Sequence, residues 1–404
     1  GGLITTLLEM CFANTEGGME INLDKIKCDD IVKILFAENP GVVIQVADKH
    51  KAEVKKILED AGVGYVKIGV PTEERHILAT LHDATYQFGI DYLRDVWYST
   101  SYLLDRKQSM NGCAKKRFEN YKQQPLEFVF DKSFTGKLSQ FGLDPNRRTP
   151  SGIKAAIIRE KGTNGEREMA YMLYLAGFDV KDITMTDLIS GRETLEDINM
   201  IVYCGGFANS DVLGSAKGWA GSFLFNPKAK AAIDNFYARE DTLSLGVCNG
   251  CQLMMELGLI TPEDKKKGKM LHNDSHKFES NFLGVTVPMN RSVMFGSLSG
   301  SKLGIWVAHG EGKFSLPYPE DHYNVVLKYS YDEYPGNPNG SDYSVAGIAS
   351  QDGRHLAMMP HLERACFPWE NAYYPLDRKD EDQITPWMEA FVNARKWVEA
   401  HKKA

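Results

Sequence analysis

Short apolar runs alternate with segments of helical spacing in the first hundred residues. Residues 3–11 and 49–61 place their apolar side chains at helical spacing, which predicts two helices. Residues 42–46 and 65–69 are short apolar runs typical of buried strands. Helices that alternate with strands in this way predict an α/β unit at the start of the chain.

A change of pattern marks the end of this unit. From residue 97 to residue 124 the pattern is helical and polar, and residues 142–150 are rich in proline, glycine and charge, which predicts a linker. We therefore expect three parts, namely an α/β part at 1–96, a helical segment and linker at 97–150, and a further domain at 151–404.

A second alternation of strands and helices begins after the linker. Apolar runs at 153–158, 200–204 and 243–247 predict strands, and residues 166–176 predict a helix between the first two. Strands that alternate with helices through short loops predict a doubly wound, mostly parallel sheet.

Cys248 lies at the centre of the most informative pattern in the chain. The sequence predicts a buried strand, a sharp turn with Cys248 at its apex and then a helix, and Gly246 and Gly250 supply the small residues that such a turn needs. Sites in parallel sheets form at the carboxyl ends of the strands, where Gly206 is also expected to lie. A thiolate there could attack a carbonyl carbon while backbone amides near Gly206 and Asn249 hold the oxyanion. The pattern predicts an acyl-transfer enzyme.

Two of these motifs have alternative interpretations. Cys248 and Cys251 form a C-x-x-C pattern, which also suits zinc binding or thiol–disulfide exchange. A structural zinc site normally needs a second close pair of ligands, which the sequence lacks, so Cys251 is interpreted as a small buried residue of the helix. Gly205-Gly206 could form only a tight turn, and a phosphate cradle is less favoured because no G-x-G-x-x-G or Walker pattern is present.

A cysteine nucleophile needs a base, and two of the ten histidines are candidates. His361 follows an apolar strand, and Glu363 lies two residues later, so both side chains of an extended segment could fall on one side. The carboxylate would hold the imidazole tautomer while the other ring nitrogen takes the thiol proton, although a structural His–Glu pair fits the spacing equally well. His309 lies among small residues, which fits either a turn histidine or close approach to a ligand or another domain.

Composition narrows the class of protein. The chain has 404 residues, of which 43% are apolar and 25% charged, as expected for a soluble globular protein of two or three domains. Its net charge of −7 and the lack of a basic cluster argue against nucleic acid as a partner. No apolar stretch approaches the roughly 20 residues needed to cross a bilayer, so no membrane association is expected. Seven scattered cysteines favour a reducing, cytoplasmic environment over a secreted disulfide scaffold.

Taken together, residues 246–252 and the pair His361-x-Glu363 resemble the class I (triad) glutamine amidotransferases. Further segments are similar to one branch of that class, the phosphoribosylformylglycinamidine synthase family of purine biosynthesis. They are residues 203–207, 211–219, 273–279, 309–312, 338–341 and 346–348. The similarity covers residues 151–404 almost continuously and implies the class I glutaminase fold for this part.

The N-terminal part resembles the end of the second synthetase-like half of the same family, an AIR-synthetase-like α/β domain. The chain opens on Gly1-Gly2 with neither an initiator methionine nor a secretory leader, so we expect it to begin within a domain. The resemblance implies a C-terminal fragment of a much longer enzyme. It also implies that the ligands of ATP and Mg²⁺ lie mainly upstream of residue 1, with no metal ligand in this chain and no cofactor for the glutaminase.

The resemblance further implies roles for individual residues. Cys248 would be the nucleophile, His361 the base and Glu363 the residue that orients the base. The oxyanion and glutamine pocket would include Gly206, Asn249 and Gln252. His309 would belong to the coupling surface or to the glutamine pocket.

Two positions depart from the family pattern. Leu362 stands where the family usually has a proline between the histidine and the glutamate, but the alternation of the two side chains is kept. Asn209-Ser210 precedes Asp211 where the family commonly has a serine-tyrosine pair, which affects the ligand contacts expected from that loop.

The resemblance implies a ligase with a glutaminase half-reaction in this chain. Glutamine would be hydrolysed through a thioester, and the ammonia would pass to a synthetase part that uses ATP to convert formylglycinamide ribonucleotide to the amidine. The expected partners are glutamine and the rest of the synthetase polypeptide. Two alternatives remain, namely a fragment that is inert alone and serves as a docking module, and a free-standing γ-glutamyl cysteine hydrolase.

Overall fold

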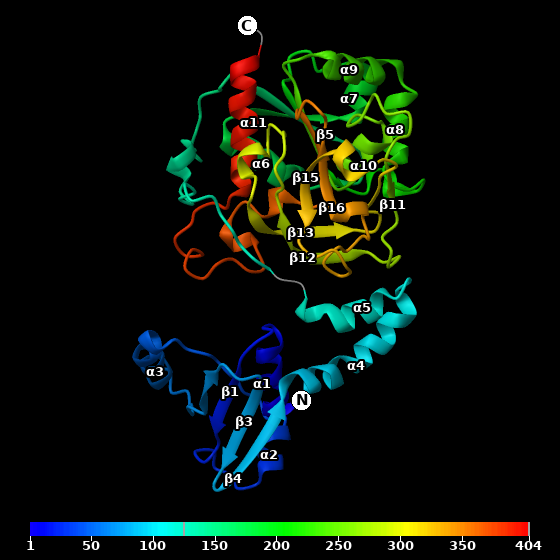
Figure 1. Cartoon of the computed structure of the whole chain (residues 1–404). Coiled ribbons are helices and arrows are strands. Elements are labelled where there is room, and N and C mark those ends of the chain that lie inside the picture. Colours follow the sequence, from blue (N-terminus) through cyan, green and yellow to red (C-terminus); the bar gives the residue numbers. More distant parts are fainter. Residues whose placement is uncertain (124–125, 403–404) are drawn as a thin grey trace. The chain divides into compact units, whose positions relative to one another are not determined.

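The computed structural model describes residues 1–123 and 126–402 of the chain (Figure 1). The chain divides into two compact units, Gly1–Lys107 and Gln108–Ala404. Within the described ranges, no helix combines the length with the apolar character that crossing a bilayer requires.

The first unit is built on a four-stranded sheet with the order β2-β1-β3-β4. Strands β1 and β3 are parallel, and the other two pairs are antiparallel. The strands are β1 (Gly18–Asn22), β2 (Gly69–Thr72), β3 (His76–Leu81) and β4 (Ala84–Gly89). The helices are α1 (Gly2–Phe12), α2 (Ile31–Phe36), α3 (Lys51–Asp60) and α4 (Ile90–Gln108), the last of which continues directly from β4. Alternate residues of β3 are buried, and they pack in one core with α1 and α2.

The predicted helices at 3–11 and 49–61 correspond to α1 and α3. The prediction of a strand at residues 42–46 is wrong, because this segment has no strand geometry and Val42 is 88% exposed. Of the run at 65–69, only Gly69 enters a strand, β2. Apolar composition alone therefore does not produce a strand where no neighbouring backbone is available for pairing.

The second unit contains a nine-stranded sheet within its described residues, in the order β13-β12-β15-β16-β17-β10-β8-β5-β7. In chain order these strands are β5 (Lys154–Arg159), β7 (Asp179–Thr184), β8 (Met200–Tyr203), β10 (Leu243–Val247), β12 (Glu279–Thr286), β13 (Lys302–His309), β15 (Asn324–Tyr329), β16 (Val345–Ala349) and β17 (His355–Met358). Two short pairs flank the sheet, β6 (Thr163–Asn164) with β9 (Gly205–Gly206) and β11 (Lys269–Leu271) with β14 (Lys313–Ser315).

Around this sheet lie the helices α6 (Glu166–Ala176), α7 (Met185–Ser190), α8 (Lys217–Leu224), α9 (Pro227–Ala238), α10 (Asn249–Glu256) and α11 (Trp387–His401) (Figure 1). Helix α5 (Cys113–Glu119) precedes the first strand of the sheet along the chain. Helix α6 packs against α11, whereas α7, α8 and α9 form a second group.

The α/β fold class is confirmed, and the sheet is mixed. The five strands from β17 to β7 are parallel to one another, as the alternation of strands and helices predicts. The four strands from β13 to β16 add an antiparallel half. Every residue of β8, β10 and β17 is buried, which is typical of central parallel strands covered on both faces.

The antiparallel half curls back onto the carboxyl ends of the parallel strands. Strand β13 is at the far edge of the sheet, yet Trp306 in β13 forms an isolated bridge with His361, which follows β17. The His361 amide donates to the Trp306 carbonyl at 2.9 Å. The last residues of β13 therefore lie beside the end of β17, which no pattern of local sequence predicts.

Gly250 sets the distance between α10 and the sheet. A Cβ atom on this residue would lie 2.6 Å from the carbonyl carbon and 2.7 Å from the Cβ of Tyr203, the last residue of β8. Real side chains do not approach backbone atoms so closely, so only glycine allows this packing. The first turn of α10 is thereby held against the end of β8.

We expect Gly250→Ala to lower the free energy of unfolding of the second unit by about 3 kcal/mol, at the upper end of measured overpacking costs, because backbone atoms of β8 cannot move aside. The control is Gly221→Ala in α8, where the new Cβ would have its nearest neighbour at 3.7 Å in Phe225. That change should leave the midpoint of thermal unfolding unchanged or raise it slightly. Equal midpoints for the two variants in a thermal melt would contradict the packing argument.

Candidate active site

Cys248 is the single residue between β10 and α10. Its backbone has φ 53° and ψ −108°, a conformation that side-chain-bearing residues rarely adopt and that typically costs about 1–3 kcal/mol. The flanking glycines allow the turn, since a Cβ on Gly246 would lie 2.5 Å from the Gly250 carbonyl oxygen. The chain thus has the strand, strained turn and helix that the sequence predicts around Cys248.

The segments that follow the neighbouring strands meet at Cys248. Gly205 follows β8, and a Cβ on it would lie 2.8 Å from Cε1 of His361 and 3.3 Å from Cβ of Cys248. The Cys248 amide also donates to the carbonyl of Met358, the last residue of β17. The carboxyl ends of three parallel strands therefore bring Cys248 and His361 together, as expected for a site in a parallel sheet.

His361 and Glu363 form a buried pair. Glu363 Oε1 lies 2.7 Å from Nδ1 of His361, and the two side chains are 1% and 4% exposed. The expected extended segment is not observed, because Leu362–Arg364 is a turn of 3₁₀ helix. The turn brings the carboxylate back to the imidazole, so the contact forms without strand alternation and without the proline.

His309 is a second imidazole at the same thiol. It ends β13 and is 2% exposed, and its Nε2 lies 2.6 Å from Oδ1 of Asn339. The preceding carbonyl, that of Ala308, accepts a hydrogen bond from Sγ of Cys248 at 3.7 Å. The sequence leaves His309 as a turn histidine or as part of the coupling surface or the glutamine pocket, and the structure places it buried at the end of β13, beside the thiol.

The electrostatics of the site favour a thiolate. Burial by itself raises the pKa of the Cys248 thiol, but the hydrogen bonds of His309 and His361 and the charge of His361 outweigh burial and lower the pKa. Burial likewise lowers the pKa of His361, and the charge of Glu363 together with the bond to Cys248 raises it above that of an ordinary histidine. A thiolate beside an imidazolium is the reactive form of a cysteine nucleophile.

Asn249 and Gln252, in the first turn of α10, form hydrogen bonds next to the turn at Cys248. The Asn249 Oδ1 atom accepts from the Ala208 amide at 2.9 Å, two residues after Gly206. Asn249 Nδ2 donates to Oε1 of Gln252 at 2.7 Å, and Gln252 Nε2 donates to the Glu311 carbonyl at 2.8 Å. Gly206 itself has φ 114° and pairs with Thr163 in the short β6–β9 ladder. The three residues expected in the oxyanion and glutamine pocket therefore lie around Cys248.

The loop after β9 has an unusual backbone. Asn209, Ser210, Asp211, Ser215 and Ala216 all have positive φ angles, and glycine is the usual residue for that region. The side chain of Asn249 donates to both oxygens of Asp211, at 3.1 and 2.9 Å. The Glu311 carboxylate accepts hydrogen bonds from the amide and the hydroxyl of Ser215.

These contacts were not predicted from the sequence. The residues concerned are Asn339, Glu311 and Ser215, which lie 30 to 96 positions from their partners. The only local signal was the run of small and polar residues that begins the loop after Gly206.

Cys251 occupies a different environment from Cys248. It is completely buried in α10, and burial raises the pKa of its thiol well above the ordinary value. Such a thiol is poorly suited to disulfide exchange, which needs an accessible thiolate. The structure thus separates the two cysteines of the C-x-x-C pattern.

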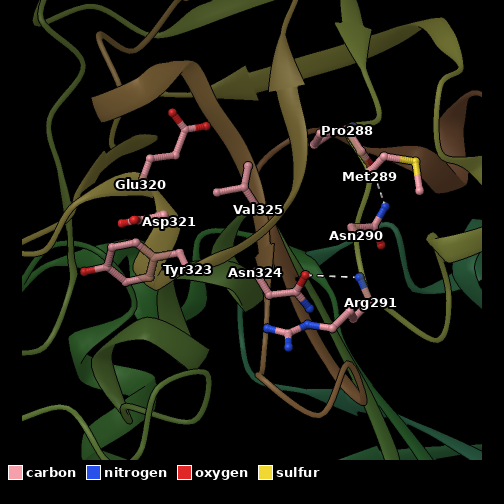
Figure 2. A pocket seen from close by; sticks show the side chains of 9 residues that line it. All are labelled: Pro288, Met289, Asn290, Arg291, Glu320, Asp321, Tyr323, Asn324 and Val325. Carbon is pink, nitrogen blue, oxygen red and sulfur yellow. Dashed lines mark hydrogen bonds between the residues drawn. The ribbon is translucent and has the colours of Figure 1, made fainter.

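A hollow of about 630 Å³ lies elsewhere in the second unit (Figure 2). It is formed by the chain after β12 and by the start of β15, with side chains such as Arg291, Glu320 and Asn324 in its lining. None of the residues predicted for the site lines it. The hollow is therefore separate from the chemistry at Cys248.

Comparisons with known proteins match both units. Residues 152–398 match the family described as CobB/CobQ-like glutamine amidotransferase domain, and residues 1–82 match the AIR synthase related protein, C-terminal domain. The probable phosphoribosylformylglycinamidine synthase, chloroplastic/mitochondrial, of Arabidopsis thaliana is 38% identical over 99% of this chain and 29% of its own length. The phosphoribosylformylglycinamidine synthase of Homo sapiens is 37% identical over 98% of this chain and 32% of its own length. The chain thus spans about a third of the length of these curated relatives.

Removal of the charge on Glu363 should raise the pKa of Cys248. In Glu363→Gln the imidazolium of His361 loses its carboxylate partner, so the thiolate loses its counter-charge. We expect the pH of half-maximal carboxamidomethylation of Cys248 by iodoacetamide, followed by mass spectrometry, to move upward by at least about one unit.

The control for this change is Glu168→Gln. Glu168 Oε1 lies 3.9 Å from Arg364 Nε, so the variant removes a nearby carboxylate that does not touch His361. Its alkylation profile should coincide with that of the unmodified chain. An unshifted profile in Glu363→Gln would show that the carboxylate does not support the thiolate.

Proposed function

The chain belongs to the family of CobB/CobQ-like glutamine amidotransferase domains, and on that premise we propose that its second unit hydrolyses glutamine at Cys248. One observation carries the proposal. The thiol projects from a strained turn at the end of a central strand, beside an imidazole whose other nitrogen is bound by a buried carboxylate. A nucleophile, its base and an orienting group in that order define a covalent acyl-transfer site.

The first half of the proposed reaction forms a thioester. The Cys248 thiolate attacks the side-chain carbonyl carbon of glutamine, and the oxyanion is held by backbone amides near Gly206 and Asn249. His361 Nε2–H then gives its proton to the departing nitrogen, the carbon–nitrogen bond breaks and ammonia leaves. Glu363 keeps the imidazole oriented through Nδ1 throughout these steps.

The second half releases glutamate. Neutral His361 accepts a proton from water, and the resulting hydroxide attacks the γ-glutamyl thioester. The carbon–sulfur bond breaks, glutamate leaves, and the thiolate and imidazolium are restored. The site thus returns to its starting protonation state, as a catalytic cycle requires.

For the whole protein we propose the ligase reaction that the relatives' name describes, in which this chain supplies ammonia for the synthesis of phosphoribosylformylglycinamidine. Residues 1–96 would be the end of an AIR-synthetase-like domain, 97–150 a helical segment and linker, and 151–404 the glutaminase. ATP and Mg²⁺ would act in a synthetase part built mainly from sequence that this chain does not span. Among the described residues, no cluster of three or more His, Cys, Asp or Glu side chains could hold a metal ion.

The proposed partners are glutamine and the remainder of the synthetase polypeptide, with a cytoplasmic location. An enclosed route for ammonia between the two sites fits this reaction, because ammonia released into neutral water would be protonated and lose its nucleophilicity. The Arabidopsis thaliana relative carries an organellar name, so subcellular fractionation of the source organism tests the location directly.

Labelling with a glutamine-like electrophile tests the nucleophile. Diazo-oxo-norleucine should form a covalent adduct on Cys248 that peptide mass spectrometry locates, because the reagent occupies the glutamine site and alkylates the attacking sulfur. Cys248→Ala should abolish the adduct and lower glutamine hydrolysis by more than about 10³-fold. Cys251→Ala is the control, and it should retain both. An adduct on Cys251, or none on Cys248 in the complete enzyme, would overturn the assignment.

Glutaminase activity of the 404-residue chain should be compared with that of the complete polypeptide in the presence of its synthetase substrates. If Cys248 needs the synthetase part in order to act, only the complete polypeptide will release glutamate, which is the result expected of a docking module that is inert alone. Equal rates in the two would instead favour a free-standing hydrolase.

A further inference from the structure

Two imidazoles, each with its own partner, meet at the sulfur of Cys248. His361 is bound through Nδ1 to Glu363, and His309 through Nε2 to Asn339. The remaining ring nitrogens, Nε2 of His361 and Nδ1 of His309, are fully buried. Apart from the thiol, neither has a hydrogen-bond partner in the described part of the chain. A buried polar nitrogen without a hydrogen-bond partner is destabilising, so both nitrogens are expected to interact with the sulfur.

The His309 ring is fixed on several sides. Gly312 packs against it, and a Cβ there would lie 2.5 Å from Nε2 of His309 and 2.9 Å from Cγ of Asn339. Asn273 donates to the His309 carbonyl at 2.7 Å and accepts from the Gly312 amide at 2.9 Å. The position of Nδ1 is therefore built into the fold and does not depend on a mobile side chain.

Resting on the proposed function, we propose that His309 is a second catalytic residue, an imidazole whose Nδ1–H donates a hydrogen bond to the Cys248 thiolate. His361 remains the group that carries the proton to ammonia. His309 exchanges no proton with the substrate in this scheme. Its role is to stabilise the negative charge on the sulfur by a hydrogen bond.

The chemistry of Asn339 makes this possible. A carboxylate such as Glu363 only accepts, so it keeps a proton on the facing nitrogen of His361. A carboxamide offers an oxygen and an NH₂ group of nearly the same shape, so it can either accept from Nε2–H or donate to a bare Nε2. Asn339 in turn contacts the hydroxyl of Tyr329 at 2.9 Å, and a hydroxyl can also donate or accept.

The chain Tyr329–Asn339–His309 can therefore keep the proton of the imidazole on Nδ1. With the Asn339 carboxamide turned over, the Tyr329 hydroxyl donates to its oxygen and its NH₂ group donates to the bare Nε2 of His309. Nδ1–H then donates to the thiolate that remains once His361 has taken the thiol proton. The contribution of His309 to the lowered pKa of Cys248 agrees with this arrangement.

Three substitutions distinguish hydrogen bonding of His309 to the sulfur from a contribution of its side chain to packing alone. The amide of asparagine can reach the place of Nδ1 of a histidine, and that of glutamine the place of Nε2. His309→Asn therefore keeps a hydrogen-bonding group at the sulfur, whereas His309→Gln keeps only the bond to Asn339. Asn339→Leu retains the imidazole but removes the group that sets its tautomer.

The readout is the rate of carboxamidomethylation of Cys248 by iodoacetamide as a function of pH, which requires neither glutamine nor the synthetase part. The titratable groups that face Cys248 are His309, His361, Glu363, Cys251 and Tyr329. In His309→Gln the rate at neutral pH should fall by about tenfold to a hundredfold, with the profile moved to higher pH, as expected for loss of one hydrogen bond to a charged atom. Asn339→Leu should move the profile in the same direction, and His309→Asn should stay within about threefold of the unmodified chain.

A thermal melt of each variant shows whether it is folded. If His309→Gln is unfolded, Asn339→Leu supplies the test. Profiles that coincide with that of the unmodified chain in a folded His309→Gln or Asn339→Leu would overturn the inference. Equal losses in His309→Asn and His309→Gln would also overturn it, because they would indicate packing alone. If the variants show these profile shifts but the complete enzyme does not hydrolyse glutamine, the proposed function is wrong. The interaction of His309 with the sulfur is then still supported.

Discussion

The close approach of α10 to the end of β8 is the constraint on which the site depends. Gly250 leaves no room for a side chain against Tyr203, and the chain must turn through a strained conformation at Cys248 to enter the helix there. The strain is tolerated because β10 is buried on both sides and hydrogen-bonded to two parallel neighbours. Packing energy of the central sheet thus holds the nucleophile in one orientation, with no adjustable loop between strand and helix.

Given that orientation, the two halves of the sheet supply different parts of the environment of the thiol. The parallel half brings the segments after β8 and β17, with Gly205 and His361. The antiparallel half curls back so that the end of β13 contributes Ala308 and His309. Each half therefore provides one imidazole, and the two differ in their partners, a carboxylate for His361 and a carboxamide for His309.

The parts of this arrangement that sequence could predict are those with local causes. The turn at Cys248 requires small residues within two positions of the cysteine, and the pairing of His361 with Glu363 spans two residues, so both leave a pattern in the sequence. Even there the predicted backbone was wrong, because a 3₁₀ turn joins His361 to Glu363 where an extended segment was expected. The bond between His309 and Asn339 spans 30 residues and depends on the curl of the antiparallel strands, which has no local signature. The apolar run at 42–46 shows the converse, because local composition without a pairing neighbour produced no strand.

The strained loop after β9 is connected by hydrogen bonds to the residues around Cys248. Asp211 is tied to Asn249, the residue after the nucleophile, and Ser215 to the carboxylate of Glu311, whose carbonyl accepts from Gln252. Each residue in the left-handed region costs of order 1 kcal/mol, and these hydrogen bonds are what offset that cost. A displacement of the loop would therefore pull on Asn249 and on the segment that packs Gly312 against His309. The loop, the oxyanion side of the turn and the second imidazole thus form one connected set, in which the geometry at Cys248 and the conformation of the loop determine each other.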